Sequence, residues 1–252
     1  MTSGMEHKTM VGSGLSPKIW GNLPVKNWAT RSGGLFFQED GLKYAADPYT
    51  IVGAVAVTNS EAGLPAFTVV SSTTDNAVTG IQTKGQLHLG FDSRWAFECA
   101  FKISSVADTV AGWGVGLAGA VLANDEAIMV NAGTVAGDFI GFHRLESDGD
   151  AIQMQVTEGA ATTVLGSAQA IGATTLYRVG MVYDGARLRS YISSAQSSPP
   201  SIDDVTEISS IDPFSQTNCD ETADMYPTIL SNAASTTAST LTVTMFAYGR
   251  EF

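Results

Sequence analysis

The chain has 252 residues, 44% of them hydrophobic and 15% charged, and its formal net charge is −12. This length fits one large domain with a sizeable core, and the negative charge disfavours binding to nucleic-acid phosphates. Two cysteines are too few for a disulfide framework. The amino-terminal residues lack a signal-peptide pattern, and no apolar run is long enough for a membrane helix. We therefore expect a protein made in a cytoplasm that binds neither nucleic acid nor a membrane.

Residues 1–34 lack sustained hydrophobic periodicity and are punctuated by glycine and proline. They contain Trp20 and Trp28, whose side chains have large apolar areas to bury. Residues 1–44 hold five Lys/Arg against three acidic residues, a balance of +2, whereas the rest holds eight against 22, a balance of −14. We interpret residues 1–34 as an extended arm whose anchors lie against its own domain or another subunit. A solvated, partly disordered terminus is the alternative.

Residues 35–252 are predicted to form a single β-domain. The first strand candidates are residues 35–38, 42–44, 50–58, 65–71, 86–90 and 112–119. A short helix is the alternative for residues 50–58, but the β-branched residues and Gly53 favour a strand. In residues 112–119, Trp113, Val115 and Leu117 share one face and glycines occupy the other. Such a glycine face indicates close approach of a backbone or an aromatic ring.

The clearest β-pattern lies in residues 95–193. Residues 96–103 place Phe97, Cys99, Phe101 and Ile103 on one face and Glu98, Ala100 and Lys102 on the other, which predicts a half-buried strand. Two hairpins follow, residues 139–145 with 151–156 and residues 176–183 with 188–192. Their turns contain Asp148-Gly149 and Asp184-Gly185, a pair of residue types that favours tight hairpin turns. These patterns predict an all-β fold, an antiparallel β-sandwich with an extended amino-terminal arm.

The last part of the chain contains two further predicted elements. Residues 202–208 fit a short turn of helix after a loop at residues 195–201. Residues 240–248 alternate cleanly, with Leu241, Val243 and Met245 predicted to face inward. Because this segment ends near the last residue of the sequence, we expect the strand to be enclosed within a sheet.

Catalytic and metal-binding patterns are weak. Glu146, Asp148 and Asp150 have the spacing of strand carboxylates that could serve a glycosidase or bind Ca²⁺, but Gly149 places them in a solvated turn. The acidic segment at residues 220–224 has a similarly weak pattern. The three histidines, among them His143 on a predicted strand, lack metal-ligand spacing, and no nucleophile elbow or dinucleotide-binding glycine motif is present. We expect no catalytic residue, no metal site and no cofactor, and therefore not an enzyme.

Four segments carry a resemblance to a known family. They are WAFECAFKI at residues 95–103, WGVGLA at 113–118, DFIGFH at 138–143 and LYRVGMVYDG at 176–185. They resemble the concanavalin A-like, laminin G-like jelly roll and are similar to head decoration, or cement, proteins of tailed bacteriophages. The region that contains them is about 40% of the chain. The motifs are structural, so they specify the fold more firmly than the function.

The resemblance implies a virion protein that binds the outer surface of an assembled capsid and reinforces it. Its partner would be the major capsid protein, and its assembly a homotrimer. The arm residues expected to dock on the capsid or on another subunit are Lys18, Trp20, Lys26, Trp28 and Arg31. The alternative is a carbohydrate-binding or host-receptor-binding module on a virion, with a glycan and a bound Ca²⁺ as ligands. A glycan hydrolase or lyase is the third interpretation, disfavoured by the missing carboxylate pattern.

Overall fold

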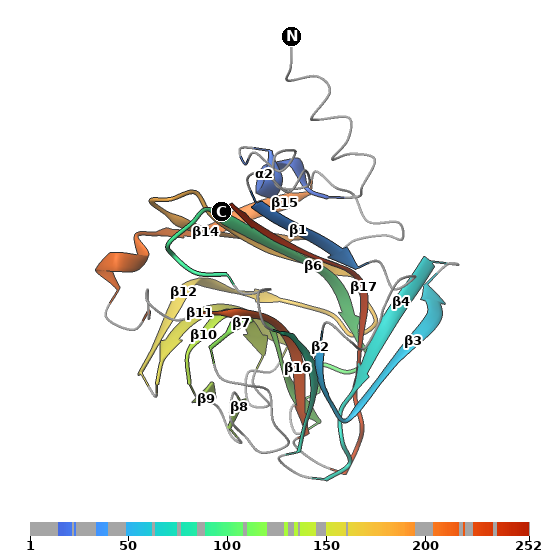
Figure 1. Cartoon of the computed structure of the whole chain (residues 1–252). Coiled ribbons are helices and arrows are strands. Elements are labelled where there is room, and N and C mark those ends of the chain that lie inside the picture. The colour runs from blue at the N-terminus through green and yellow to red at the C-terminus, as the bar shows by residue number, and fades with distance from the viewer. Residues whose placement is uncertain are drawn as a thin grey trace.

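Two antiparallel sheets pack face to face in the computed structural model (Figure 1). The structure describes residues 15–21, 23, 34–39, 49–61, 64–74, 77–84, 89–107, 110–119, 129–130, 134–135, 137–144, 150–159, 161–194, 204–216, 219, 224–233 and 236–251. The two packed antiparallel sheets confirm the predicted all-β sandwich.

Sheet A consists of β1 (Gly34–Glu39), β3 (Ala54–Glu61), β4 (Leu64–Val70), β6 (Trp95–Ile103), β13 (Tyr177–Tyr183), β14 (Leu188–Ser193), β15 (Val205–Ile211) and β17 (Thr240–Glu251). Its strand order is β15-β14-β13-β6-β17-β4-β3, and β1 also pairs with β17. The expected enclosure of the final strand is confirmed, because β17 pairs with β6 on one side and with β4 and β1 on the other.

Sheet B consists of β2 (Tyr49–Val52), β5 (Val78–Thr83), β7 (Ala111–Ala118), β10 (Phe139–Arg144), β11 (Ala151–Glu158), β12 (Ala161–Ala170) and β16 (Tyr226–Ala233). Its strand order is β12-β11-β10-β7-β16-β5-β2. A separate pair, β8 (Met129–Val130) and β9 (Thr134–Val135), lies on the sheet B side of the sandwich in Figure 1. The described helical turns are α2 (Pro17–Trp20) and η1 (Pro213–Ser215). Neither they nor any other described segment forms a helix long and apolar enough to cross a membrane.

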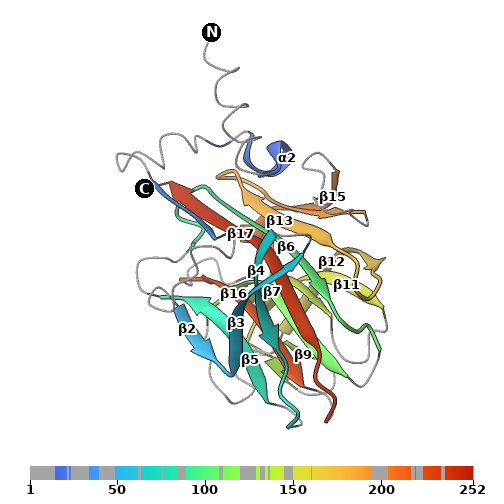
Figure 2. The same ribbon diagram turned by 90° about the vertical axis from the view of Figure 1, so that its right-hand side faces the viewer.

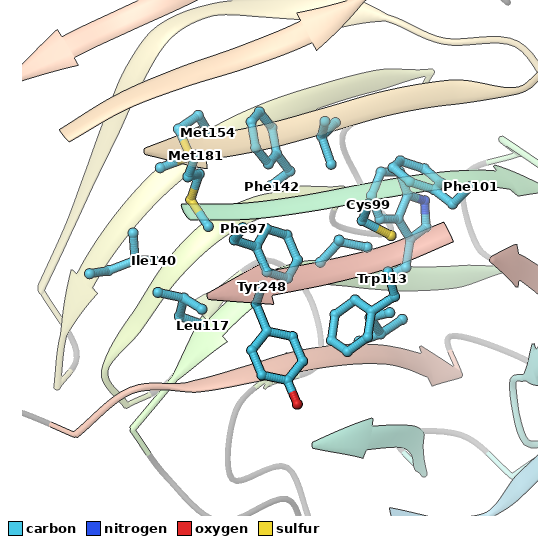
Figure 3. Packing of buried hydrophobic residues seen from close by; sticks show 14 of the residues in the cluster. Phe97, Cys99, Phe101, Trp113, Leu117, Ile140, Phe142, Met154, Met181 and Tyr248 are labelled. Atoms are coloured by element: carbon cyan, nitrogen blue, oxygen red, sulfur yellow. The ribbon is translucent and has the colours of Figure 1, made fainter. Parts of the chain in front are cut away.

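The hydrophobic core fills the space between the two sheets, and Figure 3 shows part of it. The apolar face predicted for residues 96–103 points into this core, as do Trp113, Val115 and Leu117 of β7. The other face of β7 carries glycines. A Cβ added to Gly116 on that face would lie 2.4 Å from the carbonyl oxygen of Ile140. The close backbone approach predicted at the glycine face is therefore present. Cys99 and Cys219 are both buried in the core, and neither forms a disulfide.

Both predicted hairpins are present, as the antiparallel pairs β10–β11 and β13–β14. In the second turn Gly185 has a φ of +96°, and the side chain of Asp184 accepts hydrogen bonds from the backbone N–H groups of Ala186 and Arg187. The Asp148-Gly149 turn lies outside the described residues. His143 of β10 is buried.

Two predicted elements are wrong. Residues 50–58 do not form one strand, because the chain passes from β2 in sheet B to β3 in sheet A at Gly53. Gly53 has a φ of +70°, a conformation that glycine adopts without steric cost. Within the predicted helical turn at 202–208, residues 205–208 belong to β15, because pairing with β14 satisfies their backbone groups.

Other differences arise from sheet geometry. Five strands went unpredicted, β5, β8, β9, β12 and β16, and β16 lies inside sheet B between β7 and β5. A register shift in β17 between Val243 and Met245 turns Met245 away from the core, although Leu241 and Val243 face inward as predicted. In the predicted strand 86–90, the described Leu89 forms only an isolated bridge with Met225. The predicted strand 42–44 lies outside the described residues.

The crossing between the sheets gives a stability prediction. In Gly53→Ala, the alanine would have to adopt the left-handed conformation of Gly53, and its Cβ would lie 2.5 Å from Oγ1 of Thr79. Gly159 has a φ of +58° with open space around its Cβ position, so Gly159→Ala is the matched control. We expect about 1–2 kcal/mol of lost stability for Gly159→Ala and a further ~1–3 kcal/mol for Gly53→Ala, measured by urea unfolding. Equal losses would contradict the steric role of Thr79.

Candidate functional site

A short segment of the amino-terminal arm docks on the outer face of sheet A, where α2 packs against β6 and β13 and lies next to β15 (Figure 1, Figure 2). Pro17 at the first helical position has a backbone already suited to a helix. The turn is closed by hydrogen bonds from the N–H of Trp20 to the carbonyl of Ser16 and from the N–H of Gly21 to the carbonyl of Pro17. Four residues cannot form a stable helix alone, so contacts with sheet A hold this turn.

The docking groove consists of outward-facing residues on β6, β13, β14, β15 and β17. Its apolar members are Ala96, Ala100, Val182, Tyr191, Val205, Met245 and Ala247, and they pack against Leu15, Ile19, Trp20 and Leu23 of the arm. Each of these four arm side chains is at least 92% buried, and full burial of such a side chain contributes about 1.5–3 kcal/mol. The arm is therefore anchored mainly by apolar contacts.

Small residues in the groove make room for the arm. Gly180 of β13 and Ala247 of β17 lie directly opposite Glu98 on the two strands that flank β6. A Cβ added to Gly180 would lie 2.2 Å from Cδ1 of Ile19. The absence of a side chain at Gly180 therefore admits Ile19 into the groove.

The carboxylate of Glu98 lies in the middle of the groove and is fully buried. Its Oε1 accepts a hydrogen bond from Nη1 of Arg178 at 2.5 Å, and the Arg178 side chain is 2% exposed. Its Oε2 accepts from Nε1 of Trp20 at 2.6 Å and from the backbone N–H of Ser16 at 3.0 Å. Arm and domain thus share the hydrogen bonding of one buried carboxylate.

A second polar contact lies at the edge of sheet A. The ammonium group of Lys18 donates a hydrogen bond at 2.6 Å to the backbone carbonyl of Val205, at the start of β15. Together with the Trp20 and Ser16 contacts to Glu98, it defines the position of α2 along the groove. We call this set of contacts, with the apolar contacts around it, the arm latch.

Burial is the largest influence on Glu98 and raises the pKa of its carboxyl above the ordinary value of 4.5, with Arg178 and the hydrogen bonds opposing part of that rise. A buried ion pair gains little net stability, because removing both charges from water costs about as much as their attraction returns. The pair instead helps to specify position, since the observed placement of the arm brings the N–H groups of Trp20 and Ser16 to the carboxylate. We therefore assign it a role in selecting the arm segment.

The structure describes two of the five sequence-predicted contact residues. Trp20 is wholly buried against its own domain and Lys18 binds Val205, so both hold the arm to its own chain. Lys26, Trp28 and Arg31 lie outside the described residues. The prediction that the Glu98 face of β6 is solvent-facing is wrong: the arm covers Glu98 and Ala100, and Lys102 alone among the predicted polar-face residues is partly exposed.

Sequence reasoning missed the roles of Glu98 and Arg178. One signal was available: each charge stands two residues from small residues on the same strand face, Glu98 between Ala96 and Ala100, and Arg178 before Gly180. Small neighbours leave a charged side chain in a depression that another segment can fill. The sequence alone does not say that the two charges share a sheet.

The outer face of sheet B carries polar side chains. It contains buried side chains that hydrogen-bond to one another, for example Nε2 of Gln82 to Oγ1 of Thr228 at 3.1 Å and Nε2 of Gln155 to Oγ1 of Thr157 at 2.6 Å. In all seven strands of sheet B the single acidic residue is Glu158, at the end of β11. Among the described residues no group of three or more His, Cys, Asp or Glu is placed to hold a metal ion.

The Glu98–Arg178 pair gives a testable prediction. Glu98→Ala leaves the buried guanidinium of Arg178 without its carboxylate, and we expect a loss of about 3–5 kcal/mol in the free energy of unfolding. The double variant Glu98→Met/Arg178→Met removes both charges and should lose less than Glu98→Ala alone. Urea unfolding of both variants tests this, and a double variant that loses as much stability as Glu98→Ala would argue against coupling between the two residues.

The raised pKa of Glu98 predicts a pH dependence. The folded state binds this proton more tightly than the unfolded chain, so the free energy of unfolding falls as pH rises from about 4.5 through the folded-state pKa. Glu98→Gln lacks this titration, so wild type should lose stability relative to Glu98→Gln across that window. Urea unfolding of both proteins at several pH values measures the difference. A difference that grows in favour of wild type with rising pH would show that Arg178 outweighs burial.

No protein-family model matches the chain, and no curated protein matches it in sequence. Its fold is similar to that of a protein of unknown function from Shewanella oneidensis MR-1, with a TM-score of 0.60, 14% identity and coverage of 91% of this chain and 94% of that one. Peanut lectin has a TM-score of 0.53 at 12% identity, with 86% of this chain and 97% of the lectin covered. A Bacteroides ovatus mixed-linkage glucan GH16 protein in complex with its product has a TM-score of 0.55 at 10% identity, with 84% and 99% covered. At such low identity the likeness shows the fold alone, a concanavalin A-like, lectin-type jelly roll.

Proposed function

We propose that this protein is a decoration protein that binds the outer surface of a tailed-bacteriophage capsid and stabilises it. The segments that resemble such proteins form β6, β7, β10 and β13, the strands around the core. The proposed partner is the major capsid protein, the proposed assembly is a homotrimer, and the proposed location is the exterior of the virion, after synthesis in the host cytoplasm.

The basic sequence between the arm latch and β1 carries this proposal. Residues 24–33 contain Lys26 and Arg31 and no acidic residue, on a chain whose net charge is −12. The residues on either side of this segment are held by the domain, since Leu23 is buried in the groove and Gly34 pairs with Glu251 in sheet A. We propose that Lys26, Trp28 and Arg31 contact an acidic capsid surface, while Lys18 and Trp20 anchor the segment that presents them.

The composition of sheet B supports binding rather than catalysis. Glycoside hydrolysis on a β-sandwich requires two carboxyl groups on either side of the scissile bond. The seven strands of sheet B contain Glu158 as their single acidic residue, and it lies at a strand end. We therefore propose a function without an enzymatic activity.

Carbohydrate binding is the second candidate, as part of a host-receptor-binding module on a virion. The likeness to peanut lectin and to a GH16 protein bound to its product favours it. The amide and hydroxyl side chains on the outer face of sheet B are of the kind that bind sugar hydroxyls, although Gln82, Gln155 and Thr228 are buried.

Density-gradient banding of material from the native source distinguishes the two candidates. If the protein decorates a capsid, mass spectrometry across the fractions should find it with a large particle, in fixed ratio to a shell protein. If it remains at the top of the gradient, the decoration proposal fails, and glycan-array binding with and without Ca²⁺ tests the second candidate.

A charge-reversal experiment tests the proposed contacts. The double variant Lys26→Glu/Arg31→Glu should lower affinity for purified, undecorated particles by about tenfold or more, because two favourable charge contacts become repulsive. The double variant Lys84→Glu/Arg187→Glu reverses two exposed cations of the body and is the control of equal charge change. Cosedimentation measures binding, and an equal effect of both variants would reduce the role of the arm to net charge.

A further inference from the structure

We propose that the groove on sheet A accepts the arm of a second copy of this chain as well as its own, so that copies associate by exchanging arms. The arm latch joins residues 15–23 to strands far along the chain, with sequence separations between 78 and 187 residues at its polar contacts. None of these contacts depends on which copy supplies the arm. An identical chain can therefore form the same set.

The connection between arm and domain is long enough for exchange. Ten residues, 24–33, separate Leu23 from the first residue of β1. An extended chain covers about 3.3–3.6 Å per residue, so this connection spans up to about 33–36 Å. That length is comparable to the diameter of a small domain, which brings the groove of an adjacent copy within reach.

The chemistry of the groove specifies its occupant. Glu98 requires N–H donors, which Trp20 and Ser16 supply, and the carbonyl of Val205 accepts from Lys18. Gly180 leaves the space that Ile19 fills. A second copy carries every one of these groups in the correct order, Ser-Pro-Lys-Ile-Trp at residues 16–20.

The buried ion pair favours reversible docking. When the arm leaves, Glu98 and Arg178 regain contact with water, and this hydration offsets part of the cost of exposing the apolar arm residues. Hydrocarbon side chains at these two positions would provide no such compensation. Arms held in this way can open and close again, in their own groove or in that of a neighbour.

Complementation between two full-length variants tests the exchange. Trp20→Ala damages the arm and leaves the groove intact, whereas Gly180→Val blocks the groove at Ile19 and leaves the arm intact. Each purified variant alone should have the mass of a single chain by size-exclusion chromatography with light scattering. Their mixture at high concentration should form a complex of about twice that mass, containing both differently tagged chains, because one intact arm meets one intact groove.

Two controls isolate the contact. The double variant Trp20→Ala/Gly180→Val should form no complex with either single variant, since each such mixture lacks either an intact arm or an intact groove. Val182→Glu replaces another groove residue and serves as a second blocked groove if Gly180→Val does not fold. A mixture that keeps the mass of single chains at the highest concentration, with folded variants, overturns the proposal. All measurements use the purified chain without capsids, so failure of the decoration proposal leaves this result unaffected.

Discussion

The carboxylate of Glu98 is the constraint on which the arrangement of the arm depends. It is fully buried on a face of sheet A that would otherwise meet water, and its partners are Arg178 on the neighbouring strand and two N–H donors from the arm. A buried charge with unfilled hydrogen-bonding capacity is costly, so the docked state requires all of these groups at once. Apolar burial of Leu15, Ile19 and Trp20 supplies the affinity, and the carboxylate specifies the position.

Glycine and small residues decide where segments meet. Gly180 and Ala247 flank Glu98 and lower the groove floor, so the arm can approach the sheet closely. Gly53 adopts a positive φ at the point where the chain leaves sheet B for sheet A. A larger side chain at Gly180 would collide with Ile19, and one at Gly53 would collide with Thr79.

Anchoring and partner binding occupy different parts of the arm in the proposed function. Leu15, Ile19, Trp20 and Leu23 are committed to the domain, and the basic residues that follow in the sequence lie between this anchor and β1 along the chain. Tethering reduces the conformational entropy that this segment would lose on contact with a partner. Arm exchange would use the same anchor to join copies, so one short segment would serve both to present charge and to assemble the protein.

Local pattern in the sequence determined the sandwich class, the core face of β6 and β7, the two hairpins and the buried final strand, because side-chain alternation and Asp-Gly turns act within a few residues. The arm could be recognised by its two tryptophans, but its docking site could not. The partners Glu98 and Arg178 lie 80 residues apart, and β17 turns Met245 toward the arm at a register shift. Only the tertiary structure decided these features, since pairing across sheet A brings distant residues together and a covering segment turns an apparently solvent-facing strand face into a buried one.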